Sequence, residues 1–217
     1  MIKRYLLTIL AFLGLVVLYS LTFIPLALVS SGLSQQKHLL SFGIWGAMVL
    51  ISLFPALAVI IGKIWFFKGK GEPVTRARLQ ETLMQINAAN GPVQIMEKKR
   101  KHLVTWKHQE KLWCELMSRN GMTQLYELHL FFDDATKTVE LIDKMRKVGF
   151  VDCPDRVKKG FLARPKPLLR VGLGEQWGVE NYQKRQPHEY NFKPVEIKSP
   201  VMGTILKNGW NVRFRLL

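Results

Sequence analysis

The chain has 217 residues, enough for one ordinary domain or for a smaller domain joined to a membrane anchor. It is 48% hydrophobic, yet 32 Lys and Arg against 16 Asp and Glu give a net charge of +16. Two Cys, an aromatic content of 11% and the lack of a sequence repeat exclude the collagen-like, disordered and disulfide-rich secreted classes. Residues 1–67 contain four basic residues and no acidic one, whereas residues 68–217 carry a net charge of +12.

Two uncharged runs near the N-terminus predict a transmembrane helical hairpin over residues 1–67. The runs cover residues 5–29 and 39–62. As helices with a rise of about 1.5 Å per residue, both are long enough for a hydrocarbon core about 30 Å thick. Because basic residues precede the first run, a cleaved signal peptide is an alternative reading of it, but the run is too long for a signal peptide's apolar region.

The distribution of Lys and Arg predicts the orientation of this hairpin. The residues that flank its outer ends are Lys3, Arg4, Lys63, Lys68, Lys70, Arg76 and Arg78. The connecting turn offers only Lys37. Because positive charge favours the cytoplasmic side, we expect both termini in the cytoplasm of a bacterial-type inner membrane. Cys114 and Cys153 then lie in a reducing compartment, where unpaired thiols are expected.

Residues within the two runs suggest how the helices meet. Gly43 and Ala47 form a small-xxx-small pair, which would let the helices of the hairpin approach closely. Neither run contains an acidic residue or a histidine. Since proton relays and ion pathways usually need such groups, a transporter is not expected.

The rest of the chain is expected to be a hinge followed by a domain. Residues 68–73 form the hinge, and residues 74–217 form a cytoplasmic α+β domain. A helix is predicted over 74–90 with Thr75 as its N-cap, because apolar residues recur at helical spacing up to an Asn-Gly-Pro stop. Two strands are predicted after it, over 93–97 and 102–108.

The middle of the domain contains the clearest hairpin. After a short helix over 110–119, strands are predicted over 123–132 and 137–143. The first of them has apolar residues at alternate positions, namely Tyr126, Leu128, Leu130 and Phe132. Residues 144–187 contain four Pro and five Gly, and they are predicted to be mostly loop with short strands around 168–173.

The C-terminal part is predicted to contain a strand, a helix and a final strand. Residues 188–197 are strand-like. Ser199 and Pro200 would open a short helix that Gly209 ends, and alternation over 210–216 predicts the last strand. The domain is therefore expected to be α+β with a mainly antiparallel sheet.

No arrangement of residues indicates catalysis or a cofactor. The glycine-rich run 172–178 matches no phosphate-binding pattern, and the histidines show no metal-ligand spacing. Asp133 and Asp134 lie at the predicted hairpin turn, where Asp side chains favour turn formation over acid–base catalysis. We therefore expect no enzyme, no metal and no cofactor.

Three basic clusters are candidate surfaces for membrane lipids or partner proteins. They comprise Lys68, Lys70, Arg76 and Arg78; Lys98, Lys99, Arg100 and Lys101; and Arg156, Lys158, Lys159, Arg164, Lys166 and Arg170. Anionic headgroups attract basic residues near a membrane surface, and an acidic partner surface would do the same. Nucleic acid is not expected, since no binding motif is present and aromatic residues are sparse in these clusters.

The favoured hypothesis is a non-catalytic, membrane-anchored accessory, assembly or scaffold subunit of an inner-membrane complex. Its basic domain would dock on anionic lipid, on partner proteins or on both. The alternative is an oligomeric membrane sensor or effector whose domain binds a nucleotide-like or phosphorylated ligand and gates the hairpins. An enzyme acting on lipid headgroups is a third hypothesis, which lacks a catalytic constellation.

Overall fold

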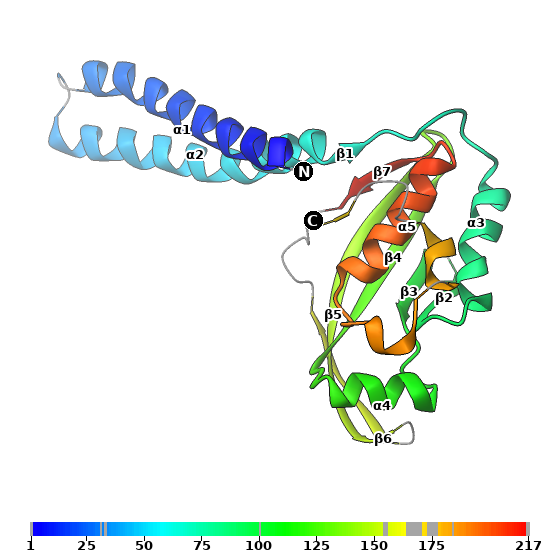
Figure 1. Ribbon diagram of the computed structural model, residues 1–217. Helices are drawn as coiled ribbons and strands as arrows, with labels where there is room; N and C mark the ends of the chain where they lie inside the picture. Colours follow the sequence, from blue (N-terminus) through cyan, green and yellow to red (C-terminus); the bar gives the residue numbers. More distant parts are fainter. Residues whose placement is uncertain are drawn as a thin grey trace. The chain divides into compact units, whose positions relative to one another are not determined.

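The computed structural model describes residues 2–30, 32, 34–99, 101–153, 156–163, 171–172, 178–183 and 185–215 (Figure 1). The chain divides into two compact units, with the boundary between Trp65 and Phe66. The first unit is a helical hairpin. The second unit contains a β-sheet and the remaining helices.

The first unit consists of α1 (Ile2–Ser30) and α2 (Gln35–Ile64), which contain the two predicted apolar runs. Both helices are long and apolar enough to cross a membrane. Polar side chains connect them. The Tyr19 hydroxyl lies 2.7 Å from Ser52 Oγ, and the Trp45 indole N–H donates to Thr22 Oγ1 at 3.2 Å.

Gly43 and Ala47 lie outside the contact between α1 and α2. Both are exposed, and a Cβ added to Gly43 would meet no atom within 4 Å. The ring of Phe23 instead contacts Phe42 and Trp45, with centroid distances of 5.2 and 5.1 Å. Aromatic packing therefore contributes to the contact between α1 and α2.

The strands of the second unit are β1 (Phe66–Phe67), β2 (Val93–Lys98), β3 (Lys101–Trp106), β4 (Gln124–Asp133), β5 (Thr138–Asp152), β6 (Arg156–Ala163) and β7 (Asn211–Phe214). In the described residues they form one sheet in the order β1-β7-β5-β4-β3-β2, with β6 also paired to β5. Because β7 runs parallel to β5, the sheet is mixed and not mainly antiparallel as predicted. Hairpins are visible as local patterns in the sequence, but the β5–β7 pairing joins distant segments.

Strand β5 is much longer than its sequence pattern suggested. It pairs with β7 over residues 138–141 and with β6 over residues 145–152. Its last ladder pair with β4 joins Lys147 to Gln124. Beyond that pair, β5 and β6 continue as a two-stranded ribbon of residues 149–152 and 156–158, called the β5–β6 ribbon below. The prediction of mostly loop over 144–187 is therefore wrong for the first part of that segment.

The helices of the second unit are α3 (Arg76–Met84), η1 (Gln85–Ala88), α4 (Lys111–Arg119), η2 (Val179–Gln183), η3 (Pro187–Glu189) and α5 (Val195–Lys207). The predicted N-cap is confirmed, because Thr75 Oγ1 accepts a hydrogen bond from the Arg78 N–H at 3.3 Å. The short helix predicted over 110–119 is confirmed as α4.

Helix α5 begins earlier than predicted. Residues 188–197 were expected to be a strand and Ser199 a helix start, but the helix already begins at Val195 and contains Pro200. A proline inside a helix leaves the carbonyl four residues earlier without its N–H donor, here the carbonyl of Glu196. The Tyr182 hydroxyl donates to this carbonyl at 2.8 Å, which replaces the missing hydrogen bond.

Helix α5 crosses one face of the sheet, and α3 lies near it (Figure 1). All its residues from Glu196 to Leu206 are buried, so the helix forms the centre of the core. The predicted core face of β4 is confirmed, since Tyr126, Leu128 and Leu130 are buried and Phe132 is half-buried. Burial does not alternate along the strand, because Leu125, Glu127 and His129 on the other face are buried as well.

Residues of the segment 68–73, the predicted hinge, hydrogen-bond to the domain. The Lys70 N–H donates to the Leu206 carbonyl at 2.8 Å. A Cβ added to Gly69 would lie 2.2 Å from the Gly209 carbonyl oxygen, so this close backbone contact requires glycine. The chain that follows α2 is thus bound to the turn between α5 and β7.

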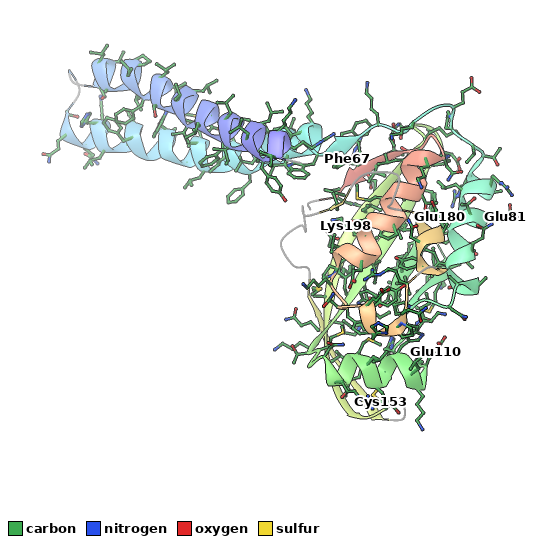
Figure 2. The ribbon with its side chains drawn as sticks, in the orientation of Figure 1. Phe67, Glu81, Glu110, Cys153, Glu180 and Lys198 are labelled. Atoms are coloured by element: carbon green, nitrogen blue, oxygen red, sulfur yellow. A yellow bond between two sulfur atoms is a disulfide. The ribbon has the colours of Figure 1, made fainter. Side chains whose placement is uncertain are left out.

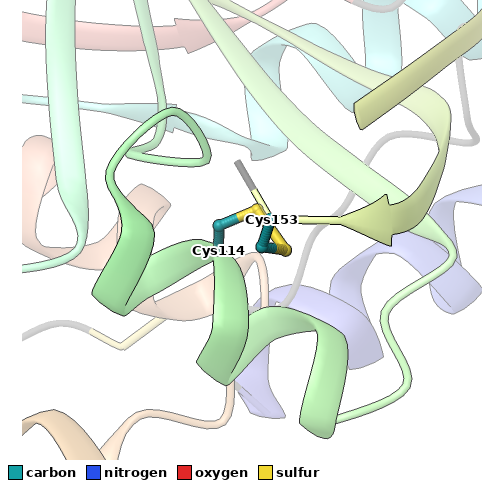
Figure 3. Close-up of a disulfide and its surroundings, with 2 residues drawn as sticks. All are labelled: Cys114 and Cys153. Carbon is teal, nitrogen blue, oxygen red and sulfur yellow. A yellow bond between two sulfur atoms is a disulfide. The ribbon is translucent and has the colours of Figure 1, made fainter. Parts of the chain in front are cut away.

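Cys114 in α4 and Cys153, which directly follows β5, form a disulfide with a Cα–Cα distance of 5.5 Å (Figure 3). This contradicts the expectation of two unpaired thiols. The sequence separation of 39 residues carries no motif, so the pairing depends on how the sheet brings the two segments together.

Candidate functional site

Basic residues from two distant segments of the chain meet on the sheet edge formed by β1 and β7. Strand β1 begins two residues after Ile64, the last residue of α2. Phe66 is the register partner of Arg213 in β7. The Arg213 guanidinium lies 5.8 Å from the centroid of the Phe66 ring, a cation–π distance.

Lys68, Lys70, Arg213 and Arg215 form what is called the basic edge below. All four are exposed. Lys68 and Lys70 form no ion pair with any described residue, whereas Arg213 and Arg215 contact Glu140 at 3.7 and 3.8 Å. Such exposed pairs contribute little energy, so the two guanidinium groups can exchange this partner for another anion. With Glu140 included, the net charge of the edge is +3.

The other predicted basic residues of this region are paired on the surface. Arg76 contacts Asp134 at 3.4 Å, and Arg78 contacts Glu81 at 2.7 Å. Both arginines lie in the first turn of α3. Of the predicted cluster, the two lysines therefore contribute most of the unbalanced positive charge.

The predicted cluster at the turn between β2 and β3 has two different roles. Lys98 and Lys99 are exposed, and Lys99 has a φ of 33°, in the left-handed region. Arg100 lies outside the described residues. Lys101 is half-buried, and its Nζ lies 3.1 Å from His129 Nδ1 in β4. Of the described residues of this cluster, Lys98 and Lys99 therefore have side chains that can face a partner.

Lys101 is one end of a polar network that crosses β3, β4 and β5. His129 Nε2 lies 3.4 Å from Glu127 Oε2, and the Arg146 Nε–H donates to Glu127 Oε1 at 2.7 Å. Because an ammonium group only donates, His129 accepts at Nδ1 and carries its proton on Nε2, towards Glu127.

The surroundings of this network favour an ionised Glu127 and a neutral His129. Burial opposes ionisation of Glu127, but hydrogen bonds and charges from His129 and Arg146 prevail and lower its pKa to about 2. Burial also lowers the pKa of His129, with a smaller contribution from the charge of Lys101. Since His129 and Glu127 are both buried, the network joins strands and does not present an acid–base pair to a substrate.

A second polar cluster lies in the core beneath α5. The Lys198 ammonium donates to Asp143 Oδ2 at 2.7 Å, and the Tyr126 hydroxyl donates to the other carboxylate oxygen. Lys198, labelled in Figure 2, has no exposed surface, and its Nζ lies 3.9 Å from the centroid of the Phe214 ring. Burial lowers the pKa of Lys198 and raises that of Tyr126. All three side chains are buried, so this cluster lies inside the core of the domain.

The third predicted cluster lies only partly within the described residues. The backbones of Arg156, Lys158 and Lys159 belong to β6, whereas Arg164, Lys166 and Arg170 lie outside the described residues. A groove of about 450 Å³ lies at the base of the β5–β6 ribbon, and its lining consists of Thr123, Gln124, Lys147, Val148, Gly149 and Gly160. Among the described lining residues, Lys147 carries a positive charge.

In the described ranges, no group of three or more His, Cys, Asp or Glu is placed to hold a metal ion. Comparisons with protein families, with curated proteins and with solved structures found no match to this chain. The basic edge is therefore the best-supported candidate site on physical grounds.

Proposed function

We propose that this chain is a non-catalytic, membrane-anchored accessory or scaffold subunit of a bacterial-type inner-membrane complex. The hairpin of α1 and α2 spans the membrane, both termini lie in the cytoplasm, and the basic edge docks on anionic lipid headgroups. The observation that carries this proposal is that the sheet begins two residues after α2, without a linker.

Chain geometry supports a headgroup location for the basic edge in any arrangement of the two units. From Ile64 to Phe66 the chain can extend by about 8 Å, at 3.8 Å per residue. Paired antiparallel strands add about 5 Å between Phe66 and Arg213. The Arg213 backbone is thus within about 13 Å of the end of α2, comparable to a headgroup layer plus one Debye length.

The charge of the basic edge is large enough to favour contact with anionic lipid headgroups. Each basic residue near an anionic surface contributes about 1 kcal/mol. A net charge of +3 therefore favours contact by about 3 kcal/mol, or a factor of about 100. Such a contact would hold the domain against the membrane and present its other surfaces, including the exposed Lys98 and Lys99, to partner subunits.

Charge reversal on the basic edge tests the lipid contact. The full-length Arg213→Glu/Arg215→Glu variant is incorporated into nanodiscs from a mixture of zwitterionic and anionic lipids, and the bound lipid is quantified by mass spectrometry. We expect it to lose the enrichment in anionic lipid shown by the wild-type chain. The matched control is Lys111→Glu/Arg119→Glu, two exposed positions of α4 with the same change in charge. Equal enrichment in all three proteins would refute the lipid contact.

A further inference from the structure

The disulfide joins α4 to the tip of the β5–β6 ribbon. Cys114 is fully buried within α4, and Cys153 is half-buried where the chain turns from β5 towards β6. Figure 1 shows α4 beside this end of the sheet, and Figure 3 shows the bond between the two elements. The bond is therefore a covalent connection between the ribbon and a helix outside it.

The β5–β6 ribbon has little support from the sheet. The β4 ladder ends at Lys147, so the ribbon beyond it has two strands only. Two-stranded ribbons are marginally stable in water. The β5–β6 pairing also shifts register twice, between Arg146 and Val148 and between Phe150 and Asp152, which interrupts the ladder. A covalent connection to α4 would therefore stabilise this end of the ribbon.

We propose that Cys114 and Cys153 form a reversible redox site that orders the β5–β6 ribbon when oxidised and releases it when reduced. In the orientation proposed above, the domain lies in a reducing compartment, where disulfides are reversible and often regulatory. The redox partner is of the glutathione type or is a dithiol protein. The inference concerns a different part of the domain from the basic edge.

The chemistry is a two-electron thiol–disulfide exchange. A reductant thiolate attacks Sγ of Cys153, the more exposed sulfur, and forms a mixed disulfide while Cys114 leaves as a thiolate and takes a proton. A second reductant thiolate then attacks the reductant sulfur of this mixed disulfide. The Cys153 thiolate is released and protonated, and the reductant departs as its own disulfide. Oxidation by a glutathione-type disulfide follows the same steps in reverse.

Release would change a basic segment of the domain. Arg156 and Lys158 belong to the ribbon, so the redox state would determine whether their backbone is held in a defined strand. The reducing compartment and any effect on lipid or partner binding rest on the proposed function. The order of the ribbon itself does not, and it can be measured separately.

Hydrogen exchange at defined redox potential tests the proposal. The full-length protein in nanodiscs is equilibrated with reduced and oxidised glutathione in different ratios, and amide exchange is measured by mass spectrometry. We expect ribbon amides to exchange about tenfold faster after reduction, while the buried α5 amides stay protected. The Cys114→Ser/Cys153→Ser variant should show the fast exchange at every ratio.

Maleimide labelling of the same samples reports the fraction of free thiols and completes the test. Labelling that follows the glutathione ratio, together with the change in exchange, supports a redox site. Equal ribbon exchange in the two redox forms would overturn the proposal. So would a bond that resists reduction until the domain unfolds, since it would then be a permanent structural disulfide. Lipid enrichment in nanodiscs is a separate measurement, so failure of one proposal is distinguishable from failure of the other.

Discussion

Removal of the Asp143 carboxylate should strongly destabilise the sheet domain. In the wild-type chain this carboxylate accepts hydrogen bonds from Lys198 and from the Tyr126 hydroxyl, beneath a fully buried helix. Asp143→Ala removes the carboxylate that pairs with the buried Lys198 ammonium group and that accepts from the Tyr126 hydroxyl. Loss of a charge partner in the core is costly because a buried ammonium group has little access to water.

The expected magnitude follows from the burial of the three groups. Breaking a buried ion pair by removing one partner costs about 3–5 kcal/mol. The Tyr126 hydroxyl, left without an acceptor, adds about 1–3 kcal/mol. The sum of about 4–8 kcal/mol is comparable to the entire stability of a typical domain, about 5–15 kcal/mol. We therefore expect Asp143→Ala to be largely unfolded or to unfold at very low denaturant concentration.

Urea unfolding of the full-length protein in mild detergent, followed by tryptophan fluorescence, measures this cost. The matched comparison is Tyr126→Phe/Asp143→Leu/Lys198→Met, which removes these three polar groups together. Because apolar replacement of a whole buried ion pair is often nearly neutral, this variant should recover most of the lost stability. A cost below about 1 kcal/mol for Asp143→Ala, as in an exposed ion pair, would refute the reasoning.

Three further predictions concern other parts of the domain. The pKa of Glu127 is lowered from 4.5 to about 2, so its contribution to stability is complete above pH 4.5 and is lost as the pH falls towards 2. Glu127→Gln should therefore flatten the pH dependence of the free energy of unfolding in this range. An unchanged slope would contradict the role assigned to Glu127. Tyr182→Phe should lower the free energy of unfolding in urea by about 1–3 kcal/mol, because the Glu196 carbonyl loses its donor. The cost should be smaller in a Pro200→Ala background, where the backbone N–H of residue 200 can donate to the same carbonyl. Equal costs in the two backgrounds would contradict this explanation. The Asn87 side chain hydrogen-bonds to the backbone N–H and carbonyl of Ile95 and so covers the outer edge of β2. Asn87→Ala should therefore aggregate faster than the control Gln85→Ala, as measured by light scattering. Equal aggregation rates would show that Asn87 does not protect this edge.

Features that depend on neighbouring residues were predictable from the sequence. The Thr75 N-cap follows from a side chain and the N–H three residues later, and the core face of β4 follows from alternation between Tyr126 and Phe132. The two apolar helices follow from run length alone. In each case a short window contains the whole physical cause.

Features that depend on distant segments were not predictable in this way. Pro200 indicated a helix start, because the sequence does not show that Tyr182 supplies the missing donor. The mixed sheet requires β7 to return beside β5, and the disulfide requires α4 to meet the end of β5. These contacts combine segments whose meeting is decided by the packing of the whole domain.

The candidate site also combines residues that the sequence indicated with residues that only the fold brings together. Lys68 and Lys70 were identified as a basic cluster from their position after the second apolar run. Arg213 and Arg215 were recognised only as polar positions in an alternating strand. Their membership in the basic edge depends on the antiparallel pairing of β1 with β7, which no local pattern reveals.

The accessory role is tested most directly by the composition of the intact particle. The full-length protein is extracted from its host membrane in mild detergent, and the mass and subunits of the particle are determined by native mass spectrometry. Our proposal predicts recovery in the membrane fraction together with other proteins in fixed stoichiometry. A particle that contains only several copies of this chain would contradict it and favour the sensor alternative, and a lone monomer would also contradict it.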